Sequence, residues 1–212
     1  MIDKPGMCTG QFWTSAASNY DFITVAYPIC VVDLGKPVEL GGLFQRSSAS
    51  DVWTRATAKT NIIPIEKHPF GLSIVGGATW DLITGANTGG FINLPVTIQV
   101  QDRLRINLNG GWLYDNVNKI SYAIWGAGFE WGFVEKKLRL IGEVFGQAGA
   151  QPAVNPGDPP SPNSIIEPRT KIGKRFAPNE KFNIDLIRGR NITGENAQWV
   201  TLGLNVHFDL GR

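Results

Sequence analysis

Histidines and cysteines are the residues of this 212-residue chain that first suggest chemistry, and there are two of each. His68 lies in a charged turn, EKHPFG, and His207 lies near the end of the last apolar segment. A hydrolase active site needs a histidine within hydrogen-bond reach of a serine or a carboxylate. In the barrel that the following paragraphs infer, such a site would lie at the outer rim, whereas both histidines are expected at the opposite rim. No HExxH, CxxC, GxSxG or Walker-type motif is present. The sequence therefore predicts no enzyme, no cofactor and no metal site.

Cys8 and Cys30 are equidistant from Asn19, which lies in the turn 18–20. If the flanking segments form a tight hairpin, the two cysteines are neighbours across its strands, near its open end. A disulfide between them is expected in an oxidising compartment such as the periplasm. Two buried free thiols fit the same positions in a reducing compartment, so the sequence leaves both states open.

A set of charged residues of both signs occupies the polar phase of otherwise apolar segments. Its members are Glu39, Arg55, Lys59, Arg105, Glu130, Glu143, Arg169, Lys171, Arg175 and Asp185. Facing lipid would cost each charge about 2–4 kcal/mol near the middle of a bilayer, so in a membrane barrel these residues must face the lumen. Glu143 stands in mid-segment, in LIGEVFGQ, and is expected beside the segment that carries Arg169, Lys171 and Arg175. Two interpretations remain open: salt bridges that fill the lumen, or a polar constriction that selects what passes.

The segments that carry these residues alternate with a period of two, which indicates β-strands. In the last segment, Val200 to Leu210 places apolar residues on one face and Thr201, Asn205 and Asp209 on the other. Helical periodicity is nearly absent, so we expect an all-β fold. The expected strands are 8–17, 22–32, 38–47, 52–64, 70–82, 91–100, 104–114, 120–133, 137–147, 168–176, 181–190 and 198–209.

The connections between the expected strands fall into two classes. After even-numbered strands they are short and charged, as in DLGKP, QDR and APNE. After odd-numbered strands they are more variable, as in TGANTGG and the Pro-rich segment 148–167. Short periplasmic turns, longer extracellular loops and an even number of strands are typical of outer-membrane barrels. We therefore expect one antiparallel up-and-down transmembrane β-barrel over residues 1–212, with an N-terminal extension at 1–7 and a long extracellular loop at 148–167.

Aromatic residues support this interpretation. Trp131, Phe133, Phe176, Phe182 and Phe208 lie near the expected periplasmic ends of their strands, and Trp112 and Tyr114 lie near an extracellular end. All of them share the phase of the apolar face, which predicts girdles at the two membrane interfaces. In a soluble barrel or sandwich, the apolar face would instead be the core, and the other face would be rich in Lys and Glu. Here that face carries Thr, Asn, Gln and Gly with scattered charges.

Composition excludes several other classes of protein. Hydrophobic residues make up 42% of the chain and charged residues 18%. The net charge is only +2, and the sequence has no cluster of Lys and Arg suited to binding nucleic acid. The longest apolar run, Val25–Val32, is under half of the roughly 20 residues that a spanning helix needs. The start, MIDKPGMC, lacks the pattern of a signal peptide, which fits a cytosolic protein or an exported chain whose leader was removed. Twelve strands predict a narrow or partly plugged lumen, because eight strands leave an interior filled by side chains and sixteen leave an aqueous channel.

Several segments of the C-terminal half resemble a known family. They are NLNGGWLYD (107–115), WGAGFEW (125–131), GEVFGQ (142–147) and the long stretch from Pro168 to Phe208. They resemble proteobacterial outer-membrane barrels, in particular the transporters associated with the meta-pathway of phenol degradation. The resemblance implies passive uptake of small, apolar or aromatic molecules. It also implies that the terminal strand ending at Phe208 carries the signal for the barrel-assembly machinery.

We therefore expect a narrow pore or passive transporter for small molecules in a bacterial outer membrane, with lipid and a small solute as its partners. One alternative is a closed structural barrel whose long loop binds an outside partner. A lipid-processing enzyme of the outer membrane that uses His207, and a soluble lipocalin-like binding barrel, are further alternatives. The sequence predicts no nucleic-acid partner and does not define an oligomeric state.

Overall fold

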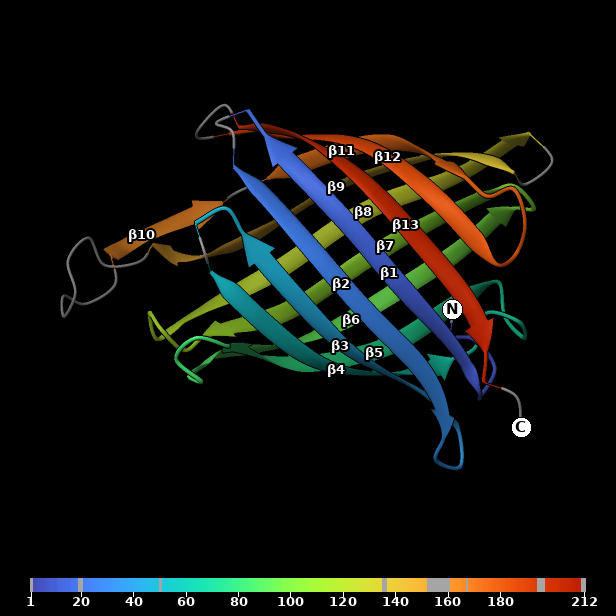
Figure 1. The fold of residues 1–212 in the computed structure, drawn as a ribbon, viewed down its shortest axis with the longest axis horizontal. Helices are drawn as coiled ribbons and strands as arrows, with labels where there is room; N and C mark the ends of the chain where they lie inside the picture. Colours follow the sequence, from blue (N-terminus) through green and yellow to red (C-terminus); the bar gives the residue numbers. More distant parts are fainter. Residues whose placement is uncertain are drawn as a thin grey trace.

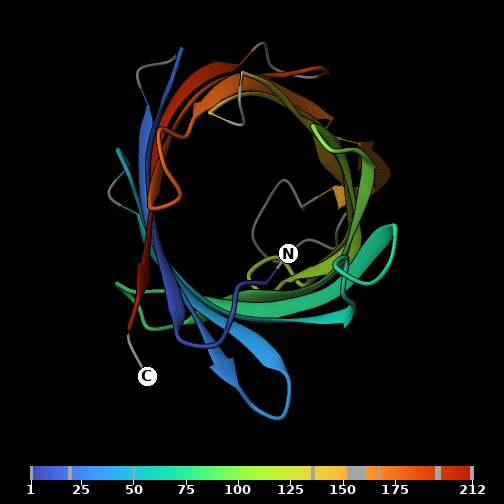
Figure 2. The same ribbon diagram turned by 90° about the vertical axis from the view of Figure 1, so that its right-hand side faces the viewer.

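The chain folds into one closed antiparallel β-barrel, seen from the side in Figure 1 and nearly end-on in Figure 2. The computed structural model describes residues 2–18, 21–49, 51–134, 137–151, 161–166, 168–193 and 197–210. Among these residues there is no helix with the length and hydropathy needed to cross a bilayer. The all-β prediction is confirmed.

Twelve strands form the wall of the barrel. They are β1 (Met7–Ala17), β2 (Phe22–Asp33), β3 (Pro37–Ser47), β4 (Val52–Ile63), β5 (Phe70–Asp81), β6 (Asn87–Gln101), β7 (Leu104–Asp115), β8 (Ile120–Val134), β9 (Leu138–Gln151), β11 (Arg169–Phe176), β12 (Phe182–Asn191) and β13 (Gln198–Asp209). Each pairs with its neighbours in sequence order, and the pairing of β1 with β13 closes the ring, with Met7 opposite Asp209. We call the rim at which β1 begins and β13 ends the terminal rim, and the opposite one the distal rim.

The described parts of the segment 148–167, which the sequence predicts as a long loop, are strands. β9 continues to Gln151, and a further strand, β10 (Ser161–Ile166), pairs with β9 and with no other described strand. This hairpin projects beyond the rest of the barrel in Figure 1. Pro162 lies where this ladder is irregular, between Ser161 and Ser164, and an edge strand tolerates a residue that lacks an N–H group. Residues 152–160 and 167 lie outside the described residues.

The outer face of the barrel is apolar and exposed. Phe12, Phe44, Ile92, Leu108 and Leu202 are each 41–54% exposed and share the outward phase of their strands. The residues predicted as girdles share that phase: Trp112 and Tyr114 towards the distal rim, and Trp131, Phe133, Phe176, Phe182 and Phe208 towards the terminal rim. A soluble barrel hides its apolar face inside and does not expose a continuous apolar surface of this extent. The exterior therefore suits lipid.

A disulfide joins the first hairpin near the terminal rim. Cys8 and Cys30 are directly opposite each other in the register of β1 and β2, and their sulfur atoms are bonded. Of the two states left open by the sequence, the structure has the disulfide. The register of β1 and β2 brings the two residues together.

Candidate functional site: the barrel lumen

The lumen is lined by polar and charged side chains that come from almost every part of the wall. Strand register places all of the charged residues predicted for the lumen on the inward phase: Glu39, Arg55, Lys59, Arg105, Glu130, Glu143, Arg169, Lys171, Arg175 and Asp185. Alternation brings them there, since side chains two apart in a strand point to the same face. Arg139, on β9, joins them and was not predicted.

Most of these charges form one cluster on neighbouring strands. The cluster, here the ionic belt, consists of Glu130 on β8, Arg139 and Glu143 on β9, Lys171 and Arg175 on β11, and Asp185 on β12. The Arg175 guanidinium donates two hydrogen bonds to the Asp185 carboxylate, at 2.7 and 2.8 Å. A third nitrogen of Arg175 lies 3.4 Å from Glu130, which also accepts a 2.6 Å hydrogen bond from Arg139. The belt thus links four strands through opposite charges.

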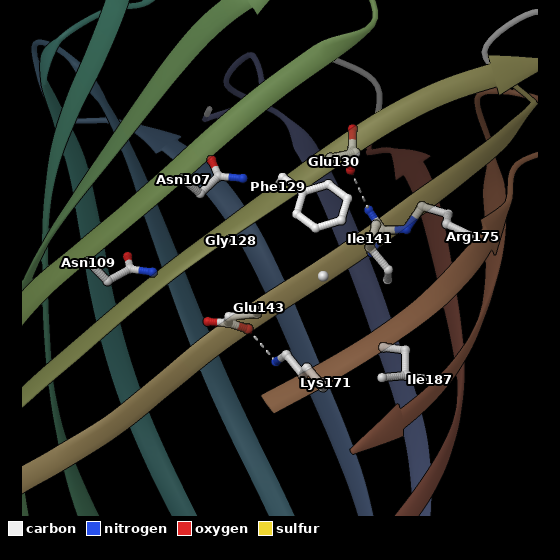
Figure 3. A pocket seen from close by; sticks show the side chains of 11 residues that line it. Asn107, Asn109, Gly128, Phe129, Glu130, Ile141, Glu143, Lys171, Arg175 and Ile187 are labelled. Carbon is white, nitrogen blue, oxygen red and sulfur yellow. Dashed lines mark hydrogen bonds and ion pairs between the residues drawn. The ribbon is translucent and has the colours of Figure 1, made fainter. Parts of the chain in front are cut away.

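Glu143 and Lys171 form the second part of the belt. The Lys171 ammonium lies 2.6 Å from the Glu143 carboxylate and 5.0 Å from the centre of the Phe145 ring. Figure 3 shows one ion pair from each part of the belt, with Glu130 reaching towards Arg175 and Glu143 towards Lys171. The belt holds equal numbers of cations and carboxylates, so its own net charge is zero.

On the far side of the barrel the charged groups are arranged differently. Lys59 on β4 lies 3.4 Å from Glu39 on β3. Arg55, also on β4, donates its Nε–H to the Thr79 hydroxyl at 3.2 Å. Arg105 lies next to the belt, on β7 opposite Glu130, and donates its Nε–H to the Gln99 amide oxygen at 2.7 Å. Within the described residues, neither Arg55 nor Arg105 forms an ion pair with a carboxylate. These two guanidinium groups therefore retain their positive charge and their remaining N–H groups for other acceptors.

Arg55 is held in place by an aromatic ring that reaches across a strand. The Arg55 guanidinium carbon lies 5.1 Å above the centre of the Phe91 ring, although β5 separates the strands of these two residues. Gly77 on β5 makes room for the ring, because a Cβ atom there would lie 2.8 Å from Phe91. A cation over an aromatic face is attracted by the negative charge of that face. Gly77 and Phe91 thus position Arg55 towards the lumen.

Four cavities follow one another through the barrel. A distal cavity of about 460 Å³ shares Arg55 with a central cavity of about 630 Å³. The central cavity shares Asn109 and Glu143 with a belt cavity of about 270 Å³, the one drawn in Figure 3. The belt cavity shares Glu130 with a terminal cavity of about 220 Å³, which reaches Asp102 and Arg103 at the terminal rim. Cavities therefore occur along the lumen from one rim to the other.

The histidines take no part in these cavities. His207 faces the lumen near the terminal rim, where its ring lies 2.9 Å from the Thr9 hydroxyl and 3.5 Å from the Asn183 amide nitrogen. Among the described residues, no group of three His, Cys, Asp or Glu side chains could hold a metal ion.

A closed twelve-strand barrel with an apolar exterior and a charged lumen has the fold of outer-membrane channels. The structure is similar to the COG4313 outer membrane channel from Pseudomonas putida F1, with a TM-score of 0.71 and 14% identity over 98% of this chain and 97% of that one. It is similar to the KdgM porin, with a TM-score of 0.69 and 8% identity over 94% and 99% of the two chains. It is also similar to the CymD monoaromatic hydrocarbon channel, with a TM-score of 0.53 and 8% identity over 99% and 90%.

The chain belongs to the family described as uncharacterised conserved protein UCP029691, whose model matches residues 1–208. No curated protein sequence matches the chain.

Proposed function

We propose that this protein is a passive pore for small molecules in a bacterial outer membrane. The observation that carries the proposal is the series of four cavities, each sharing lining residues with the next, inside a closed barrel. The exposed apolar exterior supports placement in lipid, and the similarity of the fold to outer-membrane channels supports the outer membrane in particular. In this proposal Arg55, Lys59, Arg105, Glu130, Glu143, Arg169, Lys171, Arg175 and Asp185 line the path of the solute, and the outward aromatic residues form the membrane girdles.

The proposed solutes are small, with an apolar or aromatic part. The cavities are small, and the smallest of the four has a volume of about 220 Å³. The resemblance of the C-terminal half to transporters associated with phenol degradation favours aromatic compounds, and one similar structure is a monoaromatic hydrocarbon channel. Apolar side chains also line the wider cavities, among them Phe91, Leu113 and Phe145. We place no enzymatic step in this function.

Conductance across a planar lipid bilayer tests the proposal directly. The protein, refolded in detergent and inserted from one side, is expected to give discrete current steps in 1 M KCl. A sample boiled before insertion is the control and should give none. A correctly folded barrel that inserts without current steps, and that leaves vesicles impermeable to small solutes, would contradict the pore.

The projecting β9–β10 hairpin favours a second candidate function, binding of an outside partner by a closed barrel. The hairpin extends the distal rim without contributing to the ring, so its removal separates the two functions. Replacing residues 148–166 by a short Asn-Gly turn removes the hairpin and should leave the current steps unchanged if the protein is a pore. A partner-binding barrel would instead show no current in either form, and binding to its partner would be lost in the shortened one.

A further inference from the structure

We propose that the central cavity is a binding site for a small organic anion, a carboxylate with an apolar body, and that Arg55 is its main ligand. The inference deepens the proposed function, on which it rests for the passage of that anion through the barrel. It follows from three features of the structure: the unused hydrogen-bond donors of Arg55, the walls of the cavity and the charge balance along the lumen.

Arg55 has most of its donors available. A guanidinium carries five N–H donors in a planar fork, which matches the two oxygens of a carboxylate. Only the Nε–H of Arg55 has a partner among the described residues, the Thr79 hydroxyl. The four Nη–H donors are therefore available at the wall of the central cavity, and the Phe91 ring keeps the guanidinium in its orientation.

The central cavity spans the full width of the lumen. Arg55 lies on β4 and Arg169 on β11, which are six strands apart in either direction around the ring, and both residues line this cavity. A molecule in the cavity thus meets both walls. The volume of about 630 Å³ lies within the range of small-molecule sites, which is about 300–1,000 Å³.

The lining of the cavity suits an anion with an apolar body. Leu113, Ile124 and Phe145 provide apolar surface. Gln45 and Asn109 add side-chain amides that form no hydrogen bond with another described residue, so each has donors available. Among the described residues that line the cavity, Glu143 is the one carboxylate, and the Lys171 ammonium at 2.6 Å neutralises it.

The other parts of the lumen are less suited to an anion. In the belt cavity, Arg175 is already bound by Asp185 and Glu130. The distal cavity also contains Arg55 but adds the carboxylates of Asp51, Asp81 and Asp115. The terminal cavity contains Arg105, which has no carboxylate partner among the described residues, but its lining is polar and includes the carboxylates of Asp102 and Glu130. Among the described lining residues, the central cavity thus combines an available guanidinium and apolar surface with the fewest carboxylates.

The test uses benzoate as the anionic probe and benzamide as its neutral analogue. Both are titrated against the refolded protein, in planar bilayers by the block of current and in detergent micelles by ligand-observed NMR. In the unaltered protein, benzoate should bind about tenfold more tightly than benzamide, since a hydrogen bond to a charged group contributes roughly tenfold or more in affinity. Arg55→Gln should weaken benzoate about tenfold and leave benzamide unchanged.

Two further variants separate a specific contact from a general effect of charge. Arg46→Gln removes the same charge from an exposed residue in the outward phase of β3, and should behave like the unaltered protein. Arg55→Lys keeps the charge but lacks the planar fork, and should give an intermediate affinity for benzoate. If Arg55→Gln fails to fold, as judged by its mobility on a gel without boiling, the affinity of Arg55→Lys for benzoate, compared with that of the unaltered protein, tests the site instead.

The outcomes distinguish this inference from the pore. Equal binding of benzoate and benzamide, or equal benzoate binding by the unaltered protein and the Arg55 variants, would overturn the anion site even if current flows. Arg55-dependent benzoate binding in micelles without current in bilayers would support the site and contradict the pore. Arg55-dependent block of a measurable current would support both.

Discussion

Arg175 is the residue on which the ionic belt depends, because it touches two carboxylates on different strands. It donates two hydrogen bonds to Asp185, which is only 7% exposed, and it approaches Glu130 across β9. A buried carboxylate that loses its partner pays a desolvation cost that the lost pair had offset. Substitution of Arg175 should therefore lower the free energy of unfolding more than substitution of the more exposed ion pairs of the belt.

Arg175→Gln should lower the free energy of unfolding by roughly 2–3 kcal/mol, because Asp185 then keeps only the Asn205 amide as a polar partner among the described residues. Urea unfolding in lipid vesicles, followed by tryptophan fluorescence, measures the change. Arg188→Gln is the matched control, since Arg188 lies in the outward phase of β12 and is exposed. Equal losses in both variants would show that the belt contributes nothing particular to stability.

Glu143→Gln removes a negative charge from the lumen and leaves the Lys171 ammonium without its carboxylate. The lumen becomes more positive, so the ratio of anion to cation permeability should rise, as measured from the reversal potential in a KCl gradient. Stability should change by less than about 1 kcal/mol, since the pair is partly exposed. Glu180→Gln, in an exposed connection, should leave the reversal potential unchanged. An unchanged reversal potential in Glu143→Gln would show that Glu143 has a structural role only and does not affect ion selectivity.

The inward direction of these residues could be predicted from alternation alone, but their partners could not. Glu143 and Lys171 meet because β9 and β11 pair in a register that no local pattern encodes. Glu130 and Arg175 meet across an intervening strand, which only long side chains allow. Arg139 could have been predicted, since it stands four residues before Glu143 and thus in the same phase. The role of Gly77 under Phe91 had no sequence signal, because a glycine in a strand has several explanations.

At the scale of strands, the pattern of turns predicted most of the wall. The predicted strands and the observed ones agree within a few residues at most ends. β6 differs, since it begins at Asn87 rather than at 91. Its ladder with β7 continues through Gly89 and Gly90, residues that the sequence suggested were part of a loop. Glycines mark turns in most sequences, but here Gly89 adopts a φ of 157° and lies so close to the Tyr114 carbonyl that a side chain has no room.

The disulfide of the first hairpin should stabilise the barrel. It joins residues separated by 22 positions. Closing a loop of about that length lowers the conformational entropy of the unfolded chain, which raises its free energy by about 3 kcal/mol. The double variant Cys8→Ser, Cys30→Ser should lose about that much in urea unfolding. Unaltered protein that is unfolded and refolded in dithiothreitol should match the variant. If both are as stable as the oxidised protein, the ladder of β1 and β2 alone fixes the hairpin.

The terminal strand should matter more for assembly in the cell than for folding in detergent. Phe208 lies in the outward phase of β13 and is 47% exposed, so Phe208→Ala removes little packing. We expect less protein in the outer membrane but normal refolding in micelles, because the resemblance implies that this strand carries the signal for the assembly machinery. Phe12→Ala, a 51% exposed phenylalanine on β1, is the matched control. Equal amounts of both variants in the membrane would remove this role from Phe208.

At the scale of the whole molecule, closure of the ring should make the barrel resistant to detergent. The ladder between β1 and β13 runs without interruption from Met7 to Ala17, so no open edge remains in the wall. Unboiled protein should therefore migrate differently from boiled protein on a detergent gel, with β-type circular dichroism before boiling only. No shift, together with monodisperse behaviour in plain buffer, would mean that the exposed apolar face is not a lipid-facing surface.

The seam of the ring also fixes the geometry of the two chain ends. An even number of wall strands returns β13 to the side of β1 in antiparallel order, and Met7 stands opposite Asp209 at the terminal rim. A reporter domain fused after β13 and one fused before β1 would therefore emerge on the same side of the bilayer and close together. Two halves of a split fluorescent protein attached at these points would reassemble only when the ring closes, and their fluorescence would report barrel completion in living cells.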